Sequence, residues 1–170
     1  MLFNMNKLYI LAGLPYSGKT TLRKELVKRL NFDCVSVDEI MKDKNMWRSG
    51  HPTQDDWNIA YSEAYGKLKD LLKQGRNVIL DMGNLEFKER ETARKIAESL
   101  GVEHKLIYVN TPMAEIIKRR KENEKTKLRG HLDDDLLKSA IDKFDEPTVE
   151  ENPISYNLEE NLAAWIKYNF

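Results

Sequence analysis

One loop motif constrains this chain more than any other feature of its sequence. Residues 13–20, Gly-Leu-Pro-Tyr-Ser-Gly-Lys-Thr, match the pattern G-x-x-x-x-G-K-[ST], in which backbone N–H groups surround phosphate oxygens. Such a loop follows a strand and opens a helix. Residues 7–12 read as a short buried strand, and the apolar residues after the loop recur at helical spacing, at Leu22, Leu26, Val27 and Leu30. The sequence therefore predicts a strand, a phosphate-binding loop (P-loop) and a helix in that order.

The residue types of the P-loop fit nucleotide binding. Gly13 and Gly18 permit backbone angles and close approaches that a Cβ atom would block. Lys19 is expected to reach the β- and γ-phosphates, and the Thr20 hydroxyl to coordinate Mg²⁺. The alternative, a Gly-rich turn ending in a solvated lysine, requires neither the strand nor the Gly-Lys-Thr ending. The residues assigned to nucleotide binding are Gly13, Leu14, Pro15, Tyr16, Ser17, Gly18, Lys19, Thr20 and Thr21.

Length and charge limit the remaining possibilities. The 170 residues suit a single domain, and the 28 basic and 28 acidic residues argue against a surface that coats long nucleic acid. A nucleic-acid end is still possible as a substrate. The single cysteine, Cys34, makes no intrachain disulfide and is expected to be a small core residue in a cytoplasmic protein. No stretch reaches the roughly 20 apolar residues of a membrane span, and no signal peptide is expected at the N-terminus.

Strands and helices alternate along the rest of the chain. Further strands are predicted at residues 32–37, 77–80, 105–109 and 154–156, and helices at 53–74 and 86–100, with another beginning at Thr111-Pro112. This alternation predicts a mostly parallel five-stranded sheet that is covered by helices on both faces. Together with the P-loop and the basic segment described below, it predicts an α/β fold of the P-loop NTPase type, a three-layer sandwich with a helical lid. The active site is expected at the carboxyl ends of the strands.

Two acidic residues fall where strands are predicted to end. Asp81 follows the apolar run 78–80, where an aspartate holds the Mg²⁺ shell in P-loop proteins. Its alternative is an ordinary turn aspartate. Asp38 follows the second predicted strand, and its alternative is the N-cap of a helix at 39–42. Beside a bound nucleotide, the Asp38 carboxylate could accept a proton from an attacking hydroxyl.

A basic segment late in the sequence is a candidate lid. Residues 118–129 hold seven basic residues against two acidic ones, a local charge of +5. We therefore predict a mobile cationic lid at 118–131. The alternative is a solvated helix end whose cations favour the helix C-terminus.

These features resemble the AAA_33 group of small P-loop kinases, which are related to polynucleotide 5′-kinase domains, zeta toxins and chloramphenicol phosphotransferase. The resemblance covers most of residues 7–158. It is carried by residues 13–21, 36–40, 77–81, 109–112 and 144–148, together with Asn84, Arg90 and Arg119.

The resemblance implies an ATP-dependent phosphotransferase that acts on a hydroxyl acceptor. In such kinases the acid after the second strand, here Asp38, binds or activates the acceptor hydroxyl. An arginine after the fourth strand serves the transferring phosphate, and Arg119 matches it best. The family often has a second lid arginine four residues later, where this chain has Asn123, so Arg120 and Arg129 are the candidates to replace it.

The residues themselves suggest part of an acceptor pocket and leave other functions open. Arg48 and Asn84 are substrate candidates, whereas Trp57 lies on an apolar helix face and is expected in the core. One alternative is an ATP-dependent regulatory module without a small acceptor, although residues 81–84 lack the Asp-x-x-Gly of such switches. Another is a nucleoside monophosphate kinase. GTP is disfavoured because no Asn-Lys-x-Asp follows the fourth strand.

Overall fold

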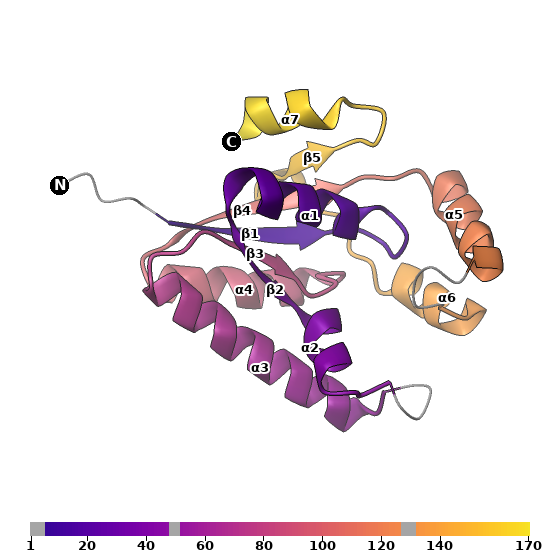
Figure 1. Ribbon diagram of the computed structural model, residues 1–170, viewed down its shortest axis with the longest axis horizontal. Helices are drawn as coiled ribbons and strands as arrows, with labels where there is room; N and C mark the ends of the chain where they lie inside the picture. The colour runs from indigo at the N-terminus through magenta and orange to yellow at the C-terminus, as the bar shows by residue number, and fades with distance from the viewer. Residues whose placement is uncertain (1–5, 48–51, 127–131) are drawn as a thin grey trace.

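The computed structural model describes residues 6–47, 52–126 and 132–170, and it shows an α/β fold built on a five-stranded sheet (Figure 1). The strands are β1 (Lys7–Ala12), β2 (Asp33–Ser36), β3 (Val78–Asp81), β4 (Glu103–Val109) and β5 (Ile154–Tyr156). They are ordered β2-β3-β1-β4-β5, and each neighbouring pair is parallel. The predicted parallel sheet is therefore confirmed, and all five carboxyl ends lie along one edge.

Helices cover both faces of this sheet. Figure 1 shows α1 and α7 on one face, α3 and α4 on the other, and α5 and α6 beyond the carboxyl ends of the strands. The helices are α1 (Lys19–Leu30), α2 (Val37–Asp43), α3 (Gln54–Lys73), α4 (Phe87–Ser99), α5 (Met113–Thr126), α6 (Asp134–Asp142) and α7 (Leu162–Asn169), with a 3₁₀ turn η1 (Val149–Glu151). In the described ranges, no helix is both long enough and apolar enough to cross a membrane.

The core is divided between the two faces of the sheet. Along β1, Leu8, Ile10 and Ala12 belong to the cluster that includes α3 and α4 residues. Tyr9 and Leu11 belong to the cluster on the α1 and α7 side. A strand buried on both faces reads as a continuous apolar run, as β1 does. The two clusters confirm the three-layer arrangement.

Two boundaries differ from the sequence-based expectation in ways that affect the site. β2 ends at Ser36, which is the N-cap of α2, and its Oγ accepts a hydrogen bond from the Glu39 N–H (3.4 Å). Asp38 therefore lies in the first turn of α2, and the alternative that it caps this helix is wrong. α5 begins at Met113, one residue later than expected, because the first helical hydrogen bonds go to the Pro112 carbonyl. The Thr111 hydroxyl instead donates to the Ser17 carbonyl (2.7 Å).

Candidate active site

The P-loop adopts a conformation that its two motif glycines permit. Gly13 has φ +149°, and a Cβ atom there would lie 2.8 Å from the carbonyl oxygen of Val109. Gly18 has φ +104°, and its Cβ would lie 3.2 Å from Nη1 of Arg119. The backbone angle therefore disfavours other residues at both positions, as the motif predicts, and at Gly13 the Val109 backbone also leaves no room for a Cβ atom.

Lys19 begins α1, and its side chain curls back over the P-loop. Its Nζ donates to the carbonyls of Gly13 (2.6 Å) and Leu14 (2.8 Å). Burial lowers the pKa of Lys19, and the charges of Asp81 and Asp38 oppose that shift. The lysine cation therefore interacts electrostatically with both carboxylates that the sequence predicted for this site.

Asp38 and Asp81 meet because their strands are neighbours. Ser36 at the end of β2 pairs with Asp81 at the end of β3, and Asp38 follows two residues after Ser36. Burial raises the pKa of both carboxyl groups, while Lys19 and Arg23 oppose the rise. The structure thus brings Lys19, Asp38 and Asp81 into one charged cluster at the carboxyl edge of the sheet.

Arg23 also belongs to this cluster, and the sequence analysis missed it. Its Nη1 donates to Oε1 of Glu39 (2.7 Å) and to Sγ of Cys34 (3.1 Å), and its Nε lies 3.2 Å from Oδ2 of Asp81. Burial lowers the pKa of Arg23, but the bonds to Cys34 and Glu39 raise it above its ordinary value. Its position four residues after Lys19 was the available signal, because that spacing places both side chains on one helix face.

Cys34 is half-buried and contacts the Arg23 guanidinium. Burial raises the pKa of its thiol. A thiol with a raised pKa is a poor nucleophile at neutral pH, which agrees with the structural role expected for this cysteine.

Arg119 reaches the P-loop from α5. Its Nη1 lies 3.3 Å from the carbonyl oxygens of both Tyr16 and Ser17, and its Nε donates to Glu115 (2.9 Å). The Tyr16 hydroxyl accepts a hydrogen bond from the Leu132 N–H (3.1 Å), so the loop also contacts the segment before α6. The predicted arginine is therefore placed against the phosphate-binding loop.

The other arginine candidates are placed differently. Arg120 donates to the Leu132 carbonyl (3.2 Å) and pairs with Asp134 (2.7 Å), so it joins α5 to α6. Arg48 and Arg129 lie outside the described residues, as do residues 127–131 of the predicted lid. The described part of that lid, up to residue 126, is helix α5.

Asn84 has a structural position. Its side chain is buried, with 1% of the residue exposed, and its amide donates to the carbonyls of Leu11 (2.9 Å) and Leu80 (3.2 Å). This burial argues against a place in the acceptor pocket. Trp57 is partly buried and packs against the core, as expected.

The oxygen groups of the site fit Mg²⁺. Thr20 is exposed at the start of α1, and Asp81 supplies a carboxylate at the end of β3. Among the described residues, no three potential metal-ligating side chains gather into a cage. Mg²⁺ in nucleotide sites typically takes one or two protein oxygens and completes its shell with phosphates and water, so this sparse donor set suits it.

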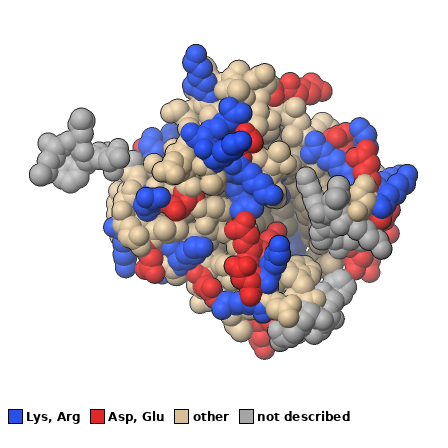
Figure 2. Space-filling view, in the orientation of Figure 1, with Lys and Arg blue, Asp and Glu red and all other residues tan. Residues whose placement is uncertain are grey.

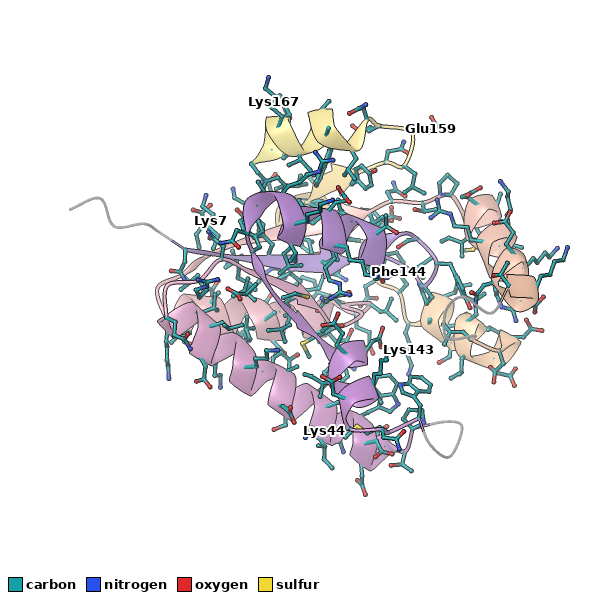
Figure 3. All side chains as sticks on the ribbon, viewed as in Figure 1. Lys7, Lys44, Lys143, Phe144, Glu159 and Lys167 are labelled. Carbon is teal, nitrogen blue, oxygen red and sulfur yellow. The ribbon has the colours of Figure 1, made fainter. Side chains whose placement is uncertain are left out.

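The surface around the site is uneven in charge. Figure 2 shows acidic side chains gathered over α2 and basic side chains over α1, with a hollow between α2 and the α5–α6 side. α2 is held to α3 by an ion pair between Lys44 and Glu63 (2.8 Å; Lys44 is labelled in Figure 3). Phe144 follows α6, and its ring centroid lies 6.0 Å from that of Tyr108.

Comparisons with known proteins identify the family and the fold of this chain. Residues 8–147 match the model of the AAA_33 family, an AAA domain. The chain is 30% identical to a shikimate kinase of Clostridium botulinum, with 93% of each chain covered. It is 27% identical to the L-seryl-tRNA(Sec) kinase of Methanococcus maripaludis, covering 82% of this chain but only 53% of that protein. Kti12 of Chaetomium thermophilum, solved with ADP-AlF3, superposes with a TM-score of 0.74 at 17% identity over 94% of both chains.

The fold, the P-loop and these relatives define an ATP-dependent P-loop kinase that transfers phosphate to a hydroxyl group. Within that class, the chain belongs to the AAA_33 family. The expected resemblance is therefore confirmed.

Proposed function

We propose that this kinase transfers the γ-phosphoryl group of MgATP to an alcohol hydroxyl on a small molecule or at a nucleic-acid end. The main support is the cluster of Lys19, Asp38 and Asp81 at the carboxyl edge of the sheet, with Arg119 against the P-loop. The names of two relatives point the same way, since shikimate and a seryl group on tRNA both carry hydroxyls. A cytoplasmic location is part of the proposal.

The phosphate side of the reaction falls to the P-loop. Its backbone N–H groups and the Lys19 ammonium would hold the β- and γ-phosphates. Thr20 and Asp81 would hold Mg²⁺, directly or through water, and the bound ion would neutralise charge on the β- and γ-oxygens. The Lys19 ammonium lies against the P-loop in this structure, because it donates to two carbonyl groups of that loop.

Asp38 would act on the acceptor. Its carboxylate would accept a hydrogen bond from the attacking hydroxyl and take up the proton as the new O–P bond forms and the bond to the β-phosphate oxygen breaks. Burial raises the pKa of Asp38, which makes it a better proton acceptor than an exposed aspartate. Since phosphoryl transfer depends mainly on positioning, orientation of the hydroxyl is the larger part of this role.

Arg119 would complete the charge around the transferring group. Its guanidinium donates to two carbonyls of the P-loop, which supports a role close to the bound phosphates. Arg129 remains the proposed second lid arginine, and Arg48 the proposed acceptor contact. Both stay predictions from the sequence.

Transfer from γ-labelled ATP to a panel of acceptors tests this proposal. The panel holds nucleosides, nucleic-acid 5′-ends, sugars, antibiotics, shikimate and seryl-tRNA, and each is assayed with the natural chain and with Asp38→Asn. Asp43→Asn is the matched control, because Asp43 is an exposed carboxylate on the same helix. Labelling that depends on Asp38 supports the proposal. Partner binding that depends on ATP, without transfer to any acceptor, would favour a regulatory module instead.

A further inference from the structure

We propose that Arg23 is a positioning residue that holds the metal-side carboxylate Asp81 and the acceptor-side helix α2 at a fixed spacing. The inference rests on the proposed function, which gives Asp81 its part in the Mg²⁺ shell and Asp38 its part in orienting the hydroxyl. Neither the P-loop pattern nor the sequence-based site includes Arg23.

The contacts of Arg23 join three elements that carry the site. The residue lies on α1, one turn after Lys19. Its Nη1 donates to Oε1 of Glu39, which is adjacent to Asp38 in the first turn of α2. Its Nε pairs with Oδ2 of Asp81 at the end of β3, at 3.2 Å. One guanidinium therefore spans the carboxylate proposed for the metal and the helix proposed for the acceptor.

Burial makes this arrangement costly to disturb. The Arg23 side chain is 8% exposed, and a buried guanidinium without carboxylate partners would be strongly unfavourable. Its Nε makes no hydrogen bond among the described residues, so charge rather than a directed bond holds it to Asp81. Arg23 therefore acts on the Asp81 carboxylate through Oδ2, at 3.2 Å.

Partners around a metal ligand commonly change metal affinity without touching the metal. Arg23 has that relation to Asp81. We therefore expect its loss to weaken the contribution of Mg²⁺ to nucleotide binding while the P-loop still binds the phosphates. On the α2 side, we expect loss of the Glu39 contact to loosen the helix that carries Asp38.

The first test measures calorimetric binding of AMPPNP, a non-hydrolysable ATP analogue, with Mg²⁺ and with EDTA. The ratio of the two affinities is the Mg²⁺ gain. Arg23→Gln is expected to lower this gain by about tenfold, as for other partners of metal ligands. The affinity for AMPPNP measured in EDTA should change little. Arg29→Gln is the matched control, because Arg29 lies on the same helix in an exposed pair with Glu25 (2.9 Å). Its Mg²⁺ gain should equal that of the natural chain.

A double-mutant cycle shows whether Arg23 acts through Asp81. Asp81→Asn should lower the Mg²⁺ gain by itself, and adding Arg23→Gln should lower it no further. Additive losses would overturn the inference, because they would mean that Arg23 acts independently of Asp81. Hydrogen exchange tests the other contact: Glu39→Gln should speed exchange of the α2 amides at residues 37–43, whereas Glu25→Gln should not.

The outcomes separate this inference from the proposed function. A natural chain that shows no Mg²⁺ gain would contradict the proposed metal site itself. If the natural chain shows the Mg²⁺ gain and Arg23→Gln shows the same gain, the role of Arg23 is overturned. The kinase proposal then stays intact. Should Arg23→Gln fail to fold, Arg23→Lys keeps the buried charge but lacks the planar fork that reaches both partners. Fast α2 exchange in folded Arg23→Lys supports the inference, and natural exchange rates in both Arg23→Lys and Glu39→Gln would overturn it.

Discussion

Two buried arginines show how the same residue type serves structure in one region and the proposed chemistry in another. Arg90 on α4 is fully buried, and its Nε and Nη2 each lie 2.8 Å from a different oxygen of Glu151. Arg94 also bonds to Glu151. These hydrogen bonds outweigh burial and hold the pKa of the Glu151 carboxyl down at about 2. A bidentate pair of this kind is fully satisfied within the protein.

The cluster around Arg23 differs in its balance of charge. Burial raises the pKa of Asp38 and Asp81 despite the nearby cations, so their ionised forms are under-compensated. Such perturbed carboxylates mark functional sites more often than structural ones. The two clusters meet through the loop after β3, because Nη1 of Arg90 donates to the Asn84 carbonyl (3.2 Å). The hydrogen-bonded cluster of Arg90 and Glu151 thus contacts the loop that follows Asp81 of the Arg23 cluster.

Removal of the Asp38 carboxylate should give the largest effect and the sharpest contrast. Asp38→Asn is expected to lower transfer to the acceptor found in the panel by about 10² to 10⁴-fold, the usual range for loss of a general base. Because the folded-state pKa of Asp38 is raised, its ionised form costs stability at neutral pH, so the same variant should melt at a slightly higher temperature. Steady-state kinetics and calorimetric melting measure both. Unchanged transfer would mean that Asp38 has no part in the reaction and is only a residue of the first turn of α2.

The opposite pattern is expected at the structural cluster. Glu151→Gln removes the carboxylate that Arg90 pairs with and leaves Arg94 with its longer pair to Glu91 (3.3 Å). Breaking a buried pair in this way costs about 3–5 kcal/mol. Urea unfolding should report that loss, while MgATP affinity of the folded fraction should change little. A loss of less than about 1 kcal/mol would show that Glu151 is not holding these arginines.

The pH dependence of stability should separate the clusters further. Glu151 has a folded-state pKa of about 2, below its ordinary value of 4.5. A depressed pKa gives stability that is present above pH 4.5 and lost as pH falls towards 2. Urea midpoints between pH 6 and pH 2.5 should therefore fall in the natural chain and fall less steeply in Glu151→Gln. Parallel curves for the two proteins would contradict the depressed pKa.

A smaller contrast is expected between the neighbours Arg119 and Arg120. Arg119→Ala should lower the turnover rate more than ATP affinity, since its charge matters most when the γ-phosphoryl group is in transfer. Arg120→Ala removes a pair with the exposed Glu124, and it also removes the pair with the exposed Asp134 and the bond to the Leu132 carbonyl that join α5 to α6. Because pairs with exposed partners contribute little, turnover should stay within about twofold. Equal losses in the two variants would show that both arginines serve the lid.

The sequence marked candidate site residues where a motif or a strand end pointed to them. Lys19 follows from the loop pattern, and Asp38 and Asp81 follow from apolar runs that end in an acid, because parallel strands bring such ends together. Arg23 was missed because an arginine on an amphipathic helix normally reads as a solvated residue. Its burial depends on Glu39 and Asp81, which only the folded sheet brings near.

Asn84 shows a different limit of the sequence. A polar residue just after a strand end reads as exposed and functional, but its positive φ (51°) and the carbonyls of Leu11 and Leu80 fix it inside the protein. Helix α7 was not predicted either. Its apolar residues Trp165 and Ile166 are buried against the sheet face that α1 also covers, so tertiary packing supports a short helix with little periodic signal.

The most direct test of the central claim is the affinity of the Lys19→Met variant for MgATP, measured by calorimetry beside its melting temperature. The account predicts a large loss of affinity with an almost unchanged melting temperature, because Lys19 supplies the phosphate-binding cation and adds little to the core. Undiminished MgATP binding by the folded variant would contradict the assignment of residues 13–20 as the nucleotide site.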